Sequence, residues 1–350
     1  MSARGAKRRP VVLYQPRDDG SVMPLGLLAL GSWLSGEHVV VVDGRFELAP
    51  EARIVELARG ALCLGVTVRT GAPMREALRV SAAARAARPD LAVVWGGPHA
   101  TAEPAACLET GVVDACVAGA GEEALAAAAS ALRAGHPLRS VAGLVDREGA
   151  GAPPLAPPAH LWPRADYALL DVERYFERRG ARRLDYCSSR GARDGGFWMG
   201  IRAERVVTEA TELAERYRLS EILFQDEDFF AEPERVEAIA RGLREGEVGL
   251  GWQAGARPGD VAAAAPELLG ILAESGCRRL RLEVEAGSPA RGQLLEAGAR
   301  LHAAGLAARF VFDVAEPRGG RFGLSEAIAV ARRLCAMDGR FETPVRRAWS

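Results

Sequence analysis

The sequence of 350 residues lacks closely spaced cysteines, an excess of charge and long hydrophobic runs. Its six cysteines are scattered, so they predict neither a disulfide framework nor a zinc site and indicate a reducing compartment. The net charge is −1 and no basic tract is interleaved with aromatic residues, which argues against a nucleic-acid partner. The apolar runs are too short to span a bilayer, and the basic residues 1–9 lead into a strand. We therefore expect a cytoplasmic protein without a membrane segment.

The first half of the sequence alternates short β-branched runs with helical segments. The predicted strands cover residues 11–14, 38–43, 61–67, 91–97 and 112–117, and the predicted helices include residues 24–34 and 122–134. Strands that are apolar throughout, separated by helices, predict a doubly wound α/β domain with a flavodoxin-like parallel sheet covered on both faces. Ligands of such sheets bind at the carboxyl ends of the strands.

Glycines and hydroxyl residues follow the predicted strands directly. Glycine lets a ligand approach the backbone closely, and hydroxyls supply neutral hydrogen bonds. Of the segments in question, Pro24-Leu25-Gly26 begins the helix after the first strand, and the others are Gln15-Pro16, Gly65-Val66-Thr67 with Thr70, Gly96-Gly97-Pro98-His99-Ala100-Thr101 and Gly119-Ala120-Gly121-Glu122. The last segment also has the spelling of a dinucleotide fingerprint, but it follows the last strand of the sheet, and Glu122 and Glu123 would repel a pyrophosphate. The pair Gly96-Gly97 taken alone is equally compatible with a simple tight turn.

A proline-rich stretch divides the chain, and the second half alternates strands and helices again. We predict domains at 8–146 and 166–350, with a linker at 147–165. Strands are expected at residues 183–187, 221–226, 248–253, 280–285, 308–313 and 340–345, and helices at 205–218 and 233–243. Five or six βα units predict a partial (β/α)6 barrel, whose site lies at the carboxyl ends of its strands.

One stretch at the start of the second half, residues 186–199, resembles the cluster-binding loop of radical S-adenosylmethionine (radical SAM) enzymes. In that family Ser-Arg-Gly introduces Cys-x3-Cys-x2-Cys, whereas here Ser189-Arg190-Gly191 is followed by Ala192, Gly196 and Met199 at the three cysteine positions. Alanine and glycine have no ligating atom, and one thioether cannot replace three thiolates. We therefore expect no 4Fe-4S cluster. Cys187 lies five residues before Ala192, and we expect it to pack as a small apolar residue.

The motifs of the first half, in their order, resemble the cobalamin-binding domain that precedes many radical SAM domains. The resemblance implies that the segments given above contact cobalamin, with Ala120 a departure from the usual Gly-Glu-Gly-Glu. The Asp-x-His-x-x-Gly signature of domains that ligate cobalt through histidine is absent, so the resemblance implies base-off cobalamin without a histidine ligand. We interpret His99 as a loop hydrogen-bonding residue, with cobalt ligation as the alternative.

The same resemblance implies contacts to S-adenosylmethionine in the second half. They fall on Asp226 and Asp228 of the segment 225–230, on Arg257, and on Glu285 and Ser288. The alternative for the two aspartates is that they are solvated loop charges that cap the following helix. The span after Ser288 is shorter than the family usually shows, and the sixth strand is barely complete, which weakens this assignment.

Two functions from different classes remain. The first is a cobalamin-binding enzyme that acts on a small molecule in specialised metabolism by non-radical methyl transfer or a related reaction, with or without S-adenosylmethionine. The second is a non-catalytic carrier, sensor or accessory protein that partners an intact enzyme or a reductase, since fold does not fix function. A third idea, a cluster bound by Cys277 and Cys335, has no support in their spacing.

Overall fold

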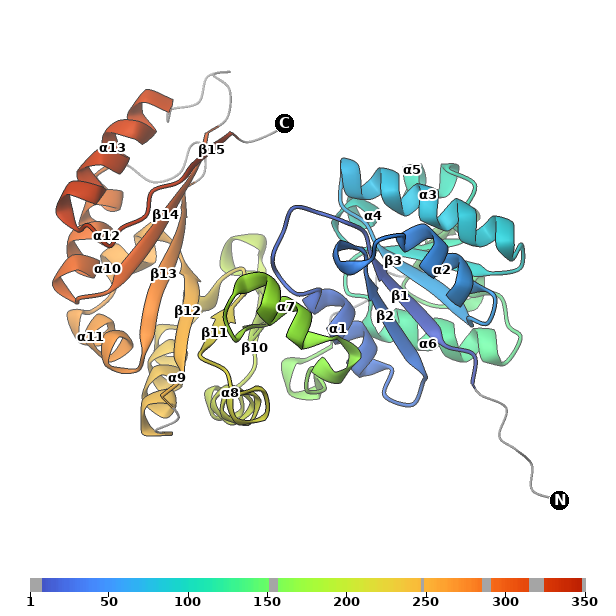
Figure 1. Cartoon of the computed structure of the whole chain (residues 1–350), viewed down its shortest axis with the longest axis horizontal. Coiled ribbons are helices and arrows are strands. Elements are labelled where there is room, and N and C mark those ends of the chain that lie inside the picture. The colour runs from blue at the N-terminus through green and yellow to red at the C-terminus, as the bar shows by residue number, and fades with distance from the viewer. Residues whose placement is uncertain (1–7, 151–156, 247–248, 285–290, 315–323, 348–350) are drawn as a thin grey trace. The chain divides into compact units, whose positions relative to one another are not determined.

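The computed structural model describes residues 8–150, 157–246, 249–284, 291–314 and 324–347. The chain forms two compact units, Met1–Tyr175 and Phe176–Ser350, which are described separately below (Figure 1). Each unit has its own sheet.

The first unit is built on a seven-stranded sheet in the order β2-β1-β3-β4-β5-β6-β7. Its strands are β1 (Val11–Gln15), β2 (Val39–Asp43), β3 (Cys63–Thr67), β4 (Ala92–Gly96), β5 (Ala115–Val117), β6 (Leu144–Asp146) and β7 (Gly149–Ala150). The five predicted strands are all present and parallel. The sequence did not predict β6 and β7, which extend the sheet in antiparallel orientation.

Helices cover both faces of this sheet (Figure 1). They are α1 (Leu25–Trp33), α2 (Pro50–Ala58), α3 (Ala72–Ala87), α4 (Pro98–Ala102), α5 (Pro104–Glu109) and α6 (Glu122–Arg133). Alternate residues of β1 enter opposite cores: Val11 and Leu13 pack with α1 and α6, whereas Val12 and Tyr14 pack with α2 and α3. Burial on both faces explains why the strands are apolar throughout.

The first unit continues beyond the boundary expected at residue 146. Residues 157–175 include the short helices η3 (Ala159–Leu161) and η4 (Tyr167–Leu169). The side chains of Trp162 and Tyr167 are buried, and the Asp166 amide donates to the Ser32 hydroxyl on α1 at 2.8 Å. The structure therefore divides the chain after Tyr175, whereas the sequence placed the start of the second domain at residue 166. The prolines of this stretch indicated a linker and gave no sign that its aromatic residues attach it to the first core.

The second unit has a six-stranded, all-parallel sheet in the order β15-β14-β13-β12-β11-β8. The strands are β8 (Arg183–Tyr186), β11 (Glu221–Phe224), β12 (Gly251–Ala256), β13 (Cys277–Val284), β14 (Ala307–Val314) and β15 (Val345–Arg347). The helices are α7 (Val172–Arg179), which crosses the unit boundary, α8 (Ala203–Tyr217), α9 (Pro233–Glu245), α10 (Pro258–Ala263), α11 (Pro266–Glu274), α12 (Arg291–Ala303) and α13 (Leu324–Met337). Consecutive strands are neighbours and each crossover carries helix, so the predicted partial (β/α)6 barrel is confirmed. The expected strands at 248–253 and 340–345 lie later in the chain, as β12 and β15.

The stretch that resembles a cluster-binding loop is an antiparallel hairpin in this structure. Its strands β9 (Ser189–Ala192) and β10 (Phe197–Gly200) are joined by the turn η5 (Arg193–Gly195). Gly191 has a φ of +77°, and a Cβ at this position would lie 2.2 Å from the Phe197 carbonyl oxygen. Only glycine therefore allows the two strands to approach so closely.

No helix of the described residues is long and apolar enough to cross a membrane.

Candidate functional site

The topology of the first sheet brings the predicted strand-end residues to one edge. Strands β1, β3, β4 and β5 are neighbours in that order and parallel, so their carboxyl ends share this edge. The residues at or next to these strand ends are Gln15, Thr67, Thr70, Gly96, Gly97, His99, Thr101, Gly119 and Gly121, with Pro24, Leu25 and Gly26 at the start of α1 and Glu122 at the start of α6. Gly65 is different, because it lies in the middle of β3 and packs against Leu13 of β1.

His99 is the best-defined polar group at this edge. Its backbone N–H donates to the Val68 carbonyl at 3.0 Å, and its Nδ1 lies 3.1 Å from the Thr70 Oγ1. The Nε2 atom is buried and has no hydrogen-bond partner among the described residues. Buried polar nitrogens are usually hydrogen-bonded, so this atom has the capacity to bond to a further polar group.

A close approach at Gly97 and a hydrogen bond at Gly119 define the loops around His99. Gly97 has a φ of +91°, and a Cβ there would lie 2.7 Å from the Thr67 Oγ1 and clash with it. The Gly119 amide donates to the Thr101 hydroxyl at 3.0 Å and so ties the loop after β5 to the one after β4. A Cβ added at Gly26 or Gly119 meets no described atom within 4 Å. Both glycines are therefore exposed, and the hydroxyl groups near this edge can supply neutral hydrogen bonds.

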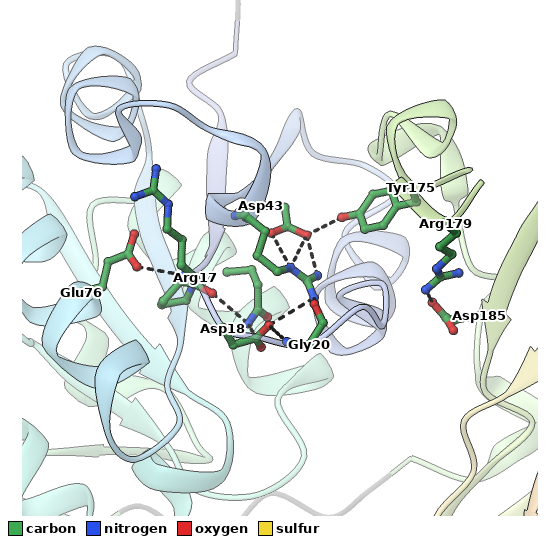
Figure 2. Close-up of polar contacts among 11 residues, drawn as sticks. Arg17, Asp18, Gly20, Asp43, Glu76, Tyr175, Arg179 and Asp185 are labelled. Atoms are coloured by element: carbon green, nitrogen blue, oxygen red, sulfur yellow. Dashed lines mark hydrogen bonds and ion pairs between the residues drawn. The ribbon is translucent and has the colours of Figure 1, made fainter. Parts of the chain in front are cut away.

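A buried polar cluster that the sequence did not predict fixes the loop after β1 (Figure 2). Arg45 pairs with Asp43 at 2.6 Å and with Asp18 at 3.3 Å, and the Gln15 amide donates to Asp18 at 3.4 Å. The Tyr175 hydroxyl donates to Asp43. Burial lowers the pKa of Arg45, but Asp43 and Asp18 outweigh it and raise the pKa above its ordinary value. The charged run after β1 and Asp43 at the end of β2 were the only sequence signals for this cluster.

The residues at the three cluster positions do not fit an iron–sulfur cluster. Ala192 and Gly196 offer no ligand atom and Met199 offers one thioether. In the hairpin register Ala192 pairs with Phe197 and Met199 with Arg190. No group of three or more His, Cys, Asp or Glu residues in the described part of the chain is arranged to hold a metal ion. Burial raises the pKa of the Cys187 thiol to about 12, and its Sγ donates to the Ser189 carbonyl at 2.9 Å.

Asp226 follows β11 and is buried at the base of the hairpin. It accepts hydrogen bonds from the Ser188 amide at 3.1 Å and the Ser188 hydroxyl at 2.7 Å, and from the Ser189 hydroxyl. Burial raises the pKa of this carboxyl, and the serine hydrogen bonds only partly oppose that. Arg235 lies beside it and donates to the Ser188 carbonyl at 2.8 Å.

Asp228 and Arg257 both lie in an ion-pair network with the hairpin turn. Arg193 donates to Asp228 from its backbone N–H at 3.1 Å and from Nε at 2.9 Å, and Arg257 Nη2 lies 3.2 Å from the same carboxylate. Burial raises the pKa of Asp228, but Arg193 and Arg257 outweigh this and hold the pKa below its usual range. Asp226 and Asp228 are only 4% and 3% exposed. The alternative expectation of solvated loop charges is therefore wrong for both.

A cavity of about 620 Å³ lies at the carboxyl ends of β11 to β13. Its lining includes Ala192, Asp226, Asp228, Arg257, Asp260 and Arg281. The remaining expected S-adenosylmethionine residues, Glu285 and Ser288, lie outside the described residues.

Comparison with known proteins identifies both units. Residues 18–129 match the family model of the B12 binding domain. The radical SAM methyltransferase TsrM from Kitasatospora setae, solved with tryptophan substrate and a SAM analogue, is 19% identical with a TM-score of 0.75, over 94% of this chain and 71% of that chain. The cobalamin-dependent radical enzyme OxsB, solved with aqua-cobalamin and S-adenosylmethionine, is 18% identical with a TM-score of 0.76, over 97% of this chain and 53% of that chain. The chain has the fold of the cobalamin-dependent radical SAM enzymes.

A curated relative matches across the two units. The uncharacterized methyltransferase PH0819 of Pyrococcus horikoshii is 29% identical over 287 residues, which cover 76% of this chain. This chain spans 61% of the length of that relative. The resemblance and the fold expected from the sequence are therefore confirmed, and the match to the B12 binding domain lies within the first unit.

Proposed function

We propose that this chain binds cobalamin at the carboxyl edge of its first sheet and takes part in methyl transfer to a small molecule without an iron–sulfur cluster. The observation that carries the proposal is the match of residues 18–129 to the B12 binding domain, together with three cluster positions that lack thiolates. The relatives named as methyltransferases support the reaction class.

The protein residues would hold the cofactor rather than react. The loops around Gly97 and Gly119 would border the corrin, with Thr67, Thr70 and Thr101 as neutral hydrogen-bonding groups. The Nε2 of His99, which has no hydrogen-bond partner among the described residues, would bond to a polar group of the cofactor. Cobalamin supplies a cobalt centre that can carry a methyl group, and the protein supplies position and environment. Polar methyl transfer needs no radical, so it needs no cluster.

The non-catalytic alternative is favoured by one observation. Asp228 and Arg257, which the resemblance assigned to S-adenosylmethionine, contact each other and the hairpin turn. A chain whose ligand-binding charges are already engaged is suited to act as a carrier or accessory protein for a partner enzyme or reductase. Titration of the cobalamin-loaded chain with S-adenosylmethionine separates the two functions: binding supports the enzyme, and its absence supports the accessory protein.

The first test is anaerobic purification with hydroxocobalamin, followed by absorbance spectra and quantification of cobalt and iron. We expect cobalt near one per chain and no iron. Iron and sulfide bound in cluster amounts would contradict the cluster-free part of the proposal, and an absence of both metals would contradict cobalamin binding.

A matched pair of variants locates the cobalamin. Gly26 and Gly60 are both exposed, and a Cβ at either meets no described atom within 4 Å. Gly26 lies at the proposed edge, and Gly60 precedes β3 at the opposite end of its strand. Gly26→Leu should weaken cobalamin binding roughly tenfold or more by filling ligand space, whereas Gly60→Leu should leave the dissociation constant unchanged.

A further inference from the structure

The turn of the β9–β10 hairpin carries an ion-pair network with no role in the proposed chemistry. Arg193 lies between Ala192 and Gly196, the first two positions at which the resemblance places cysteines. Its guanidinium donates two hydrogen bonds to Asp228, from Nε at 2.9 Å and from Nη2 at 3.0 Å. The same Nη2 donates to Asp260 at 2.7 Å. One side chain of the turn therefore connects to the loop after β11 and to α10 after β12.

Two further residues of the hairpin reach the same loops. Arg257 donates to Asp194 at 2.6 Å, and the Trp198 indole donates to the Asp228 carbonyl at 3.0 Å. Three residues of the hairpin, Arg193, Asp194 and Trp198, therefore attach the turn to these loops. The Asp228 side chain is 1% exposed, and a carboxylate buried to this degree is stable only when it is paired and hydrogen-bonded.

The base of the hairpin is held independently of the turn. Asp226 accepts from both the amide and the hydroxyl of Ser188. Arg235 donates to the Ser188 carbonyl at 2.8 Å and to the Ile201 carbonyl at 2.8 Å, one residue beyond each end of the hairpin. Loss of the contacts at the turn should therefore open the hairpin locally and leave its base in place.

We propose that Arg193 is a positioning residue that closes the β9–β10 hairpin through Asp228 and Asp260, where the loop it resembles would be held by bonds from thiolates to iron. Five charged groups, Arg193, Arg257, Asp194, Asp228 and Asp260, form this latch. It sets the Ala192 wall of the 620 Å³ cavity and engages Asp228 and Arg257 with protein rather than ligand. The inference rests on the proposed function in one respect, the absence of a cluster.

Hydrogen exchange of the full chain, read by mass spectrometry over residues 189–200, tests the latch. Arg193→Gln should speed exchange of the hairpin roughly ten- to a hundredfold, because it removes two charged hydrogen bonds from a buried carboxylate and leaves Arg257 as its ion-pair partner. Arg193→Lys keeps the charge without the planar fork and should give an intermediate rate. The control is Arg241→Gln, which removes an exposed pair with Glu237 on α9 of the same unit and should leave the hairpin unchanged.

A double variant separates the latch from a general loss of stability. In Arg193→Gln with Asp228→Asn the buried charge that has lost its Arg193 partner is gone, so part of the protection should return relative to Arg193→Gln alone. The latch would be contradicted if the exchange rate of the double variant rose by the product of the factors measured for Arg193→Gln alone and for Asp228→Asn alone. It would also be contradicted if Arg193→Gln left the exchange rate of the hairpin unchanged. Wild-type chain treated anaerobically with iron and sulfide distinguishes the two proposals. Bound iron that slows hairpin exchange contradicts the cluster-free function, whereas an iron-free chain with an insensitive Arg193→Gln variant contradicts the latch alone.

Discussion

Asp226 is a buried carboxyl whose folded environment favours its protonated form. Burial raises its pKa, so over the pH range above the unfolded value of about 3.9 the folded chain binds more protons than the unfolded chain. Stability contributed by Asp226 is therefore full below that value and lost as pH rises through the raised pKa.

The variant Asp226→Asn isolates this effect. Asparagine keeps the size and an Oδ1 that can accept the hydrogen bonds of Ser188 and Ser189, but it carries no charge and does not titrate. The free energy of unfolding of the wild type relative to the variant should then fall as pH rises from about 4. Urea unfolding of both proteins at several pH values measures it, and a difference that does not change with pH would contradict the raised pKa.

At the scale of single residues the sequence predicted where the polar groups lie but not what they contact. Asp226 and Asp228 were placed correctly after β11, yet their partners Ser188 and Arg193 are more than thirty residues away in the chain. Spacing within a motif cannot show such pairs. His99 was interpreted as a loop hydrogen-bonding residue, and its contact with Thr70 agrees with that, while its role toward cobalt stays a prediction.

Among the elements, the loop between β1 and α1 depends on Arg45 and the acids around it. The Arg45 side chain is 4% exposed. Its loss would leave the carboxylates of Asp43 and Asp18 without the buried positive charge that pairs with both. We expect Arg45→Gln to lower the free energy of unfolding by about 2 kcal/mol and to weaken cobalamin binding through the loop that carries Gln15. Urea unfolding and a cobalamin titration measure the two effects. Arg53→Gln, which breaks an exposed pair with Glu56, is the control and should change neither.

Elements with a strong apolar pattern were predictable and those without one were not. The parallel strands of the first sheet are short and largely apolar, and several helices of both units begin at a proline. The hairpin at 189–200 and the pair β6–β7 have glycine and charged residues instead of alternation, so only their partners in three dimensions define them. The proposed cobalamin edge followed from topology once the strand order was known.

For the molecule as a whole, cobalamin should stabilise the unit that binds it. A ligand present at a hundred times its dissociation constant adds about 2.7 kcal/mol to the folded state. We expect slower hydrogen exchange in β1, β3, β4 and β5 on addition of hydroxocobalamin, with the six-stranded sheet of the second unit unchanged. Exchange that stays the same throughout the first unit would contradict binding at its carboxyl edge.

The short helix η4 has a consequence for how the first unit can be isolated. Strand β2 is the outermost strand of its sheet and contains four successive valines, Val39 to Val42. An uncovered edge of that kind templates pairing with other chains and promotes aggregation. In this structure η4 (Tyr167–Leu169) lies against β2. A fragment ending at residue 146 would lose this contact and should aggregate, whereas one ending at residue 175 should stay dispersed.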